Sequence, residues 1–463
     1  MTDSDTGTVP DQPASVATRV FETTVGHIVG RVDGDVVRVL GVPYAVAERF
    51  ERPRPRYPVI GPDGEPMPVL ALHRSPSSPQ VSSPVVDELI EGSNDGLTFL
   101  EDCHALSITI PADPAPGERF PVMVWIHGGG YVTGAGDSEI HDPHALVVEQ
   151  RVIVVTINYR LGMLGYYGDG KAMPANLGLF DQLAAVRWVH ENIDAFGGAA
   201  DSITLFGQSA GGDAIAHLMI SEDSAGLFHR VIVQSAPLGI SRGRSRMVRA
   251  MVKAAGAPSP EAPLSEVLAL QGVAERAARR FGLRGAMAFG TQYGHAPLPP
   301  EKDIDDAWRA VAPDVDVLIG SIVDETRLYI PLLPRVHRVT RLPIIGRVAR
   351  WLLVRLTTHA VYTRGVRHFA ARHRAAGGRA VIYELRWAPE RSPVGAAHLT
   401  DVPLLLGSRD AWTRTSLVDA ADWEEIDARG RRMRQIWADF ARTGTVAADG
   451  DADLRSLITF DRG

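Results

Sequence analysis

Cysteine is almost absent from this chain, because Cys103 is the only one among 463 residues. A single thiol cannot form an intrachain disulfide, which excludes a small disulfide-stapled scaffold. Excess positive charge is also missing: 48 basic against 55 acidic residues give a formal net charge of −7. That balance argues against a dedicated nucleic-acid-binding protein.

Two kinds of apolar segment are missing as well. No run of 18 apolar, charge-free residues occurs, so the sequence predicts no transmembrane helix. The first 20 residues have no basic stretch followed by an apolar one, as a secretory signal would have. We therefore expect a cytoplasmic protein, with residues 1–19 as a flexible tail and 20–463 as one domain.

Apolar segments alternate in character through the middle of the chain. Short β-branched runs at 107–110, 121–129, 152–159, 202–207 and 231–236 predict buried strands, and the segments between them have helical spacing. Alternation of this kind predicts an α/β fold with a mostly parallel central sheet and helices on both faces. Helices are predicted at 177–196 and, as the last one, at 423–442, and further strands at 316–322 and 380–387. Inserted helical cap segments are expected at roughly 238–310 and 327–378.

The strongest local motif is Gly207-Gln208-Ser209-Ala210-Gly211, between a predicted strand and a predicted helix. A serine on such a sharp strand-to-helix turn is typical of a nucleophile elbow. The alternative is a glycine-rich turn with a capping serine. The elbow interpretation predicts Ser209 as a nucleophile.

A second glycine motif, His127-Gly128-Gly129-Gly130, ends the predicted strand 121–129. Acyl transfer needs backbone N–H donors directed at a developing oxyanion, and glycines let the backbone come close. We expect Gly129, Gly130 and Ala210 to supply these donors. A dinucleotide-binding loop is the alternative, but the spacing does not match GxGxxG.

Several segments, in order, resemble the type-B carboxylesterases, the cholinesterase-like branch of the α/β-hydrolases. They include LGVPYA (40–45), NYRLGMLGY (158–166) and GLFHRVIVQSA (226–236), besides the two glycine motifs. The resemblance is dense from 20 to 237 and sparse afterwards. It implies the α/β-hydrolase fold and a serine ester hydrolase that needs neither cofactor nor metal.

The resemblance also implies the partners of the serine. LIGSIVDET (318–326) matches the block that carries the family's acid, which assigns Glu325, although Asp324 is adjacent. GAAHLTDVP (395–403) matches the block that carries the family's histidine, which assigns His398. Leu399 stands where the family has glycine, Asp401 where it has glutamate, and Gln208 where it often has glutamate before the serine.

The resulting hypothesis is a carboxylic-ester hydrolase with a Ser209–His398–Glu325 triad, an acyl-enzyme and a small-molecule ester substrate. Alternatives are a catalytically silent binding protein of the same fold and a hydrolase of amides, carbamates or lactones. Among the other polar residues, Glu101, Asp102 and Arg160 are expected in structural ion pairs. His127 is expected to be structural, Cys103 a buried apolar residue, and His141 and His144 surface or capping residues.

One basic segment stands apart. Residues 331–356 contain six arginines and no acid among apolar residues. Either it is a cap helix and loop with a solvated arginine face, or it is a mobile lid beside the substrate pocket that contacts apolar substrates or, weakly, an anionic lipid surface, as basic amphipathic segments can. Its arginines argue against a membrane span.

Overall fold

The computed structural model describes residues 17–81, 90–330, 345–389, 392, 394–418, 421–447 and 452–463. Most of the expected tail, 1–16, and part of the basic segment, 331–344, therefore lie outside the described residues. The first strand begins at Thr18, two residues before the expected start of order.

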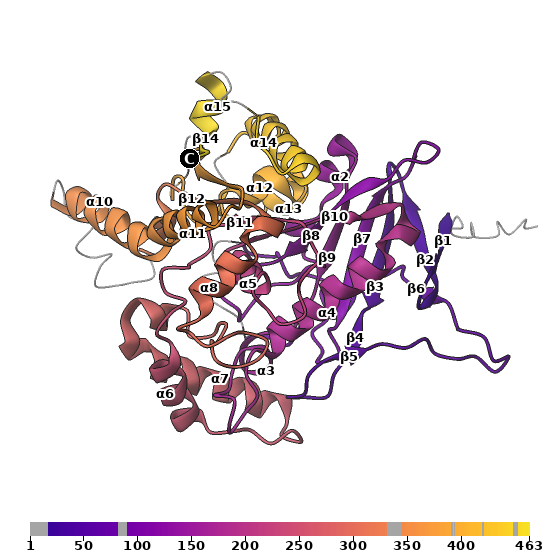
Figure 1. Ribbon diagram of the computed structural model, residues 1–463, viewed down its shortest axis with the longest axis horizontal. Coiled ribbons are helices and arrows are strands. Elements are labelled where there is room, and N and C mark those ends of the chain that lie inside the picture. Colours follow the sequence, from indigo (N-terminus) through magenta and orange to yellow (C-terminus); the bar gives the residue numbers. More distant parts are fainter. Residues whose placement is uncertain are drawn as a thin grey trace, which may run out of the picture.

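A twelve-stranded sheet crosses the molecule (Figure 1). Its main path runs β1-β2-β3-β7-β9-β8-β10-β11-β12-β13-β14, and β6 pairs with β2. The strands of this sheet are β1 (Thr18–Thr23), β2 (Gly26–Asp33), β3 (Val36–Pro43), β6 (Val69–Leu70), β7 (Ala105–Pro111), β8 (Phe120–Ile126), β9 (Ile153–Ile157), β10 (Gly198–Gln208), β11 (Arg230–Gln234), β12 (Asp316–Ile322), β13 (Ala380–Leu385) and β14 (Ile458–Asp461). A separate two-stranded sheet joins β4 (Ala45–Val46) and β5 (Arg54–Pro55).

The parallel part of the large sheet is its centre. From β9 through β8, β10, β11 and β12 to β13 every pairing is parallel, whereas β1-β2-β3-β7-β9 and β13-β14 pair antiparallel. The central strands are almost wholly buried, as expected for parallel strands covered on both faces.

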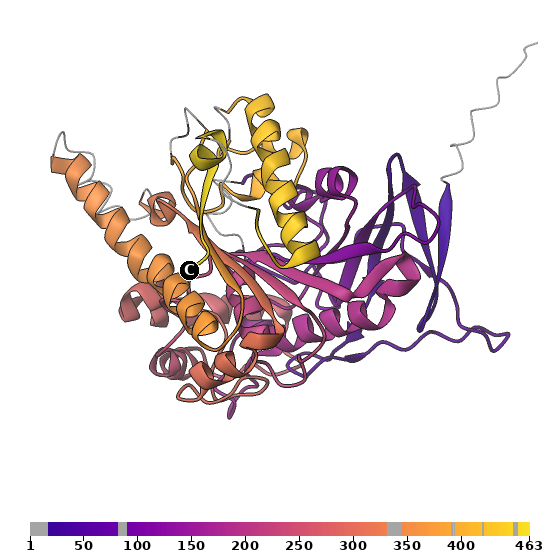
Figure 2. The same cartoon turned by 45° about the horizontal axis from the view of Figure 1, so that its top comes forward.

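Side chains alternate between two apolar cores, one on each face of the sheet. Along β8, Val122, Val124 and Ile126 pack into one core, while Met123 and Trp125 pack into the other. This is the two-residue period of a strand. The first core is closed by α4 and α5, and the second by α2, α12 and α14, on the opposite face (Figure 2).

The covering helices follow the strands they were expected to follow. The expected helix 177–196 is α4 followed by the short η2, and the expected last helix 423–442 is α14. The bounds are η1 (Glu139–His141), α2 (His144–Gln150), α3 (Gly162–Gly165), α4 (Leu177–Asn192), η2 (Ile193–Phe196), α5 (Ala210–Leu218), α12 (Val402–Leu405), α13 (Arg409–Trp412), α14 (Trp423–Thr443) and α15 (Ala452–Leu457).

Helical segments separate the later strands. Between β11 and β12 lie α6 (Ser245–Ala255), α7 (Leu264–Ala278), η3 (Arg279–Ala286), α8 (Ile304–Ala310) and η4 (Ala312–Asp314). Between β12 and β13 lie η5 (Glu325–Tyr329), α10 (Ile345–Thr358), the π-helical turn η6 (His359–Thr363) and α11 (Arg364–Ala375). Among the described residues, no helix has both the length and the hydropathy needed to cross a bilayer.

Candidate active site

Ser209 occupies a strained turn between β10 and α5. Its backbone has φ 58° and ψ −122°, a conformation that residues other than glycine rarely adopt. Its N–H donates to the carbonyl of Gln234 on β11 over 2.9 Å, which ties the turn to the sheet. Backbone strain of this kind costs on the order of 1–3 kcal/mol and persists only where the surroundings hold it.

The two flanking glycines are a steric requirement of that turn. A Cβ on Gly211 would lie 1.9 Å from the carbonyl oxygen of Ile126, at the end of β8, and one on Gly207 would lie 2.5 Å from the same oxygen. Rigid backbone lies at both positions, so neither clash can be relieved by turning a side chain. The spacing Gly-x-Ser-x-Gly therefore follows from how closely β10 and α5 pack on β8.

The loop after β8 faces this turn with free backbone donors. Gly129 and Gly130 both have positive φ, 101° and 63°, and a Cβ on Gly129 would lie 2.1 Å from the carbonyl of Thr133. Within the described part of the chain, no acceptor pairs with the N–H groups of Gly129, Gly130 or Ala210. Ala210 is also the first residue of α5, where the helix dipole favours negative charge.

His398 and Glu325 form a buried pair. The imidazole Nδ1 lies 2.5 Å from Glu325 Oε2, and the other carboxylate oxygen accepts the N–H of Ile322 over 2.8 Å. The backbone N–H of His398 also donates to the Glu325 carbonyl over 3.2 Å. These contacts place the ring proton on Nδ1 and leave Nε2 as the basic nitrogen.

Asp324, the neighbouring carboxylate, faces a different direction. Its side chain is 44% exposed and lies 3.8 Å from the guanidinium of Arg327, whereas Glu325 is fully buried. Of the two adjacent carboxylates, Glu325 is the one that contacts His398.

Gln208 contacts Nε2 of His398, the ring nitrogen that does not face Glu325. Its side-chain Nε2 lies 3.2 Å from His398 Nε2, so the amide N–H donates to the imidazole lone pair. No hydrogen bond joins Ser209 Oγ to His398 in the described structure. Contacts between nucleophile and base are often loose without substrate and tighten when it binds. The sequence marked Gln208 as a departure from the family pattern but gave no sign of this contact.

Two tyrosines enclose the imidazole. The rings of Tyr329 and Tyr362 lie 5.8 Å and 5.3 Å from that of His398. Tyr362 comes from the π-helical turn η6 and packs with Ile240 and Val361, with Met287 against them. These apolar groups were not predicted, because they belong to the segments after residue 237, where recognisable motifs are sparse.

Asp401 is a second buried carboxyl, close to the His398–Glu325 pair. Its Oδ2 accepts the Gln234 side-chain amide over 2.7 Å, while Oδ1 has no partner within the described residues. Burial, reinforced by the negative charge of Glu325, raises the pKa of Asp401 to about 6. The folded protein therefore binds a proton here more tightly than the unfolded chain, whose aspartates have a pKa near 3.9.

This shift predicts a pH-dependent gain in stability for Asp401→Asn. Above pH 6 the wild type carries a buried charge that costs about 3 kcal/mol, from a shift of roughly two pKa units. Below about pH 4 the carboxyl is protonated in both states and the cost disappears. Urea unfolding should give a higher free energy of unfolding for the variant than for the wild type. This difference should grow from pH 4.5 to pH 7 and then level off. A difference independent of pH would contradict the buried charge.

The other singled-out residues have structural partners. Glu101 pairs with Arg49, Asp102 lies 4.0 Å from Arg56, and Arg160 forms a buried pair with Asp181 at 2.7 Å. These are the expected structural ion pairs, with partners that the sequence did not identify. Cys103 is fully buried, and burial raises the pKa of its thiol.

The histidines outside the pair also have local contacts. His127 is buried and stacks on Tyr159, and burial lowers the pKa of His127 to about 3, which makes it neutral. His141 is buried and bonds to the Ala135 carbonyl, so the expectation of a surface position was wrong for this residue. No group of three or more metal-binding side chains occurs in the portion of the chain that is described.

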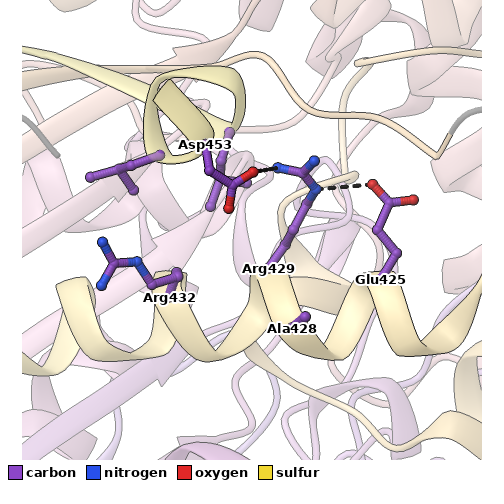
Figure 3. A pocket seen from close by; sticks show the side chains of 7 residues that line it. Glu425, Ala428, Arg429, Arg432 and Asp453 are labelled. Atoms are coloured by element: carbon purple, nitrogen blue, oxygen red, sulfur yellow. Dashed lines mark hydrogen bonds and ion pairs between the residues drawn. The ribbon is translucent and has the colours of Figure 1, made fainter. Parts of the chain in front are cut away.

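Two cavities of about 230 and 250 Å³ lie away from these residues. The first, between α14 and α15, surrounds Arg429, which already pairs with Glu425 and Asp453 (Figure 3). The second lies near the start of α6 and includes Arg244 and Tyr293. Neither is lined by Ser209, Glu325 or His398.

Comparison with known proteins fits this geometry. A sequence profile described as the carboxylesterase family matches residues 17–340. The chain belongs to the carboxylesterase family. As the resemblance implied, it is a carboxylesterase-type hydrolase with the α/β-hydrolase fold.

Related hydrolases match nearly end to end. A probable N-octanoylanthranilate hydrolase of Rhodococcus erythropolis is 34% identical, over 90% of this chain and 91% of its own. The para-nitrobenzyl esterase of Bacillus subtilis is 29% identical, over 93% and 91%. Among solved structures, a thermophilic PNB esterase superimposes with a TM-score of 0.78 at 26% identity, covering 96% of this chain and 97% of its own.

Proposed function

We propose that this carboxylesterase uses Ser209 as nucleophile, His398 as general base and Glu325 as the orienting acid. The observation that carries the proposal is the buried His398–Glu325 pair beside the turn of Ser209. The imidazole presents Nε2 next to Gln208, the residue that immediately precedes the serine. We propose that the backbone N–H groups of Gly129, Gly130 and Ala210 form the oxyanion hole.

The reaction follows from these roles. His398 Nε2 accepts the Ser209 proton as Oγ attacks the ester carbonyl, and Glu325 stabilises the imidazolium through Nδ1. The three N–H groups stabilise the oxyanion of the tetrahedral intermediate. The intermediate collapses to an acyl-enzyme as the alcohol leaves with the proton from His398. Water, activated by His398, then releases the acid.

Small uncharged esters with an apolar acyl group are the substrates that the surroundings support best. Tyr329 and Tyr362 provide apolar surface beside His398, and Ile240 and Met287 extend it by packing in the same cluster as Tyr362. Cleavage of an N-acyl bond is the second candidate, because the Rhodococcus relative is described as acting on an N-octanoyl compound. A silent binding role is disfavoured, because the serine and the histidine–carboxylate pair are all present.

A matched substrate panel tests the proposal. p-Nitrophenyl acetate, butyrate and octanoate should all be hydrolysed, and a fluorophosphonate should abolish all three activities together. N-octanoyl-p-nitroaniline, with the same acyl chain, distinguishes an amidase from an esterase. No hydrolysis of any compound, together with no labelling by the fluorophosphonate, would contradict the proposal.

Gln208→Glu should move the pH dependence of kcat/KM. A carboxylate beside His398 Nε2 favours the charged imidazole, since an opposite charge at this distance shifts a pKa by about one unit or more. The acid limb of the kcat/KM profile for p-nitrophenyl butyrate should therefore move to higher pH by about one unit. Gln208→Met, of similar size and uncharged, is the control: it removes the amide donor, which stabilises only the neutral imidazole, but adds no charge, so the limb should move by clearly less than in the glutamate variant. An unchanged profile in the glutamate variant would show that Gln208 does not contact the base.

A further inference from the structure

Helix α10 has an exposed apolar stripe. Val348, Leu352 and Leu356 follow one another at intervals of four residues and are 54%, 45% and 65% exposed, and Trp351 beside them is 58% exposed. Residues at this spacing lie on one side of a helix. In both views α10 extends away from the body of the molecule (Figures 1 and 2). Contiguous exposed apolar side chains of this kind mark an interaction surface.

The same segment carries unpaired positive charge. From α10 through η6 to α11, residues 345–375 include no aspartate or glutamate. Five exposed arginines of this segment have no ion-pair partner among the described residues. These arginines are Arg347, Arg350, Arg355, Arg364 and Arg367. One of them, Arg355, lies over the ring of Trp351, with 5.5 Å between its guanidinium carbon and the ring centre.

The charge decides which partner fits. A second copy docked by the same face would bring arginines against arginines, which disfavours a symmetric dimer. An anionic lipid surface instead accepts the apolar stripe at its acyl boundary and the guanidinium groups at its phosphates. We propose that α10 docks this protein on anionic lipid surfaces, with the stripe Val348–Trp351–Leu352–Leu356 inserted at the headgroup level.

The C-terminal end of α10 is held against the candidate active site. Oγ1 of Thr326, the residue after Glu325, lies 2.6 Å from Thr357 Oγ1 and 3.2 Å from the Val354 carbonyl. The turn that follows α10 brings Tyr362 against His398. Docking therefore places the rim of that site near the lipid. The consequence for substrates rests on the proposed function: a site held near the lipid favours substrates that partition into a bilayer, such as esters with long acyl chains.

Sedimentation with vesicles tests the docking without using activity. The full chain carrying Ser209→Ala should pellet with vesicles of phosphatidylcholine and phosphatidylglycerol, much less with phosphatidylcholine alone, and less at high salt. Leu352→Ser with Leu356→Ser should lower the partition coefficient about tenfold or more, given the apolar area removed. Arg347→Gln with Arg350→Gln should lower it on the order of fivefold for each charge.

The chain offers a matched control for the leucine variant. Leu70 and Leu283 are 66% and 45% exposed on other elements, so Leu70→Ser with Leu283→Ser removes comparable area and should leave sedimentation unchanged. Equal loss in both leucine variants would overturn the proposal, as would a wild type that stays in the supernatant with anionic vesicles. A dimer in solution that Leu352→Ser with Leu356→Ser dissociates, without vesicle binding, would assign the face to a second copy instead.

Discussion

Ser209→Ala is expected to lower kcat/KM for p-nitrophenyl butyrate by at least a thousandfold, on the order of 10⁴. Without Oγ there is no acyl-enzyme, and only the oxyanion donors and substrate binding still contribute to the rate. The fold should not change, because the serine side chain makes no capping hydrogen bond to α5. Alanine also has no greater difficulty than serine with the positive φ of this turn.

A second serine provides the control. Ser224 is also buried, and it bonds through Oγ to the Ser221 carbonyl in the loop after α5. Ser224→Ala should keep full activity and full labelling by a fluorophosphonate, whereas Ser209→Ala should lose both at an unchanged Tm. Residual activity near that of the wild type would exclude Ser209 as the nucleophile.

Those parts of the site that depend on local backbone geometry could be predicted from the sequence. The turn that holds Ser209 against β8 tolerates no side chain at Gly207 or Gly211. The need for glycine on both sides of the serine therefore appears within five consecutive residues of the sequence. The same is true of the loop after β8, where Gly129 has a positive φ and a carbonyl directly beside it. Steric constraints that act on consecutive residues produce a short sequence motif. Such a motif can be recognised in a single sequence.

The partners of the serine could be assigned only through the resemblance. Glu325 and His398 meet across more than seventy positions of the chain, and nothing in either segment alone indicates the contact. Leu399 has a φ of 77°, in the left-handed region that glycine adopts freely, so leucine is strained at the position where the family has glycine.

Other features depend on tertiary packing that no local pattern encodes. Whether Gln208 points at His398 or away from it depends on how the histidine loop docks, which is a contact across 190 residues. Tyr362, whose ring lies beside that of His398, belongs to a π-helical turn, and helical spacing in the sequence does not reveal such a turn. The antiparallel strand β14, which closes the sheet beside β13, follows the last predicted helix and was not anticipated.

Glu325→Gln is expected to lower kcat by about 10³–10⁴, while Asp324→Asn changes it little. The carboxylate accepts two hydrogen bonds, from His398 Nδ1–H and from the Ile322 N–H. An amide has one oxygen. If that oxygen keeps the Ile322 bond, the NH2 group faces Nδ1 and drives the ring proton to Nε2, where the serine proton must go. If the amide turns round, two buried donors oppose each other at Ile322, which costs on the order of 1–3 kcal/mol of stability.

The two orientations of the side-chain amide in Glu325→Gln predict different values of kcat and Tm. Measuring both quantities therefore shows which orientation the amide adopts. An unchanged Tm with a large loss in kcat indicates the wrong tautomer, whereas a lowered Tm with a smaller loss indicates the reversed amide. Asp324→Asn is the matched control, since its half-exposed carboxylate lies 3.8 Å from Arg327 and its loss leaves no buried group unpaired. A larger loss of kcat in Asp324→Asn would mean that the orienting carboxylate is Asp324. The short contact between Glu325 and His398 would then have no part in catalysis.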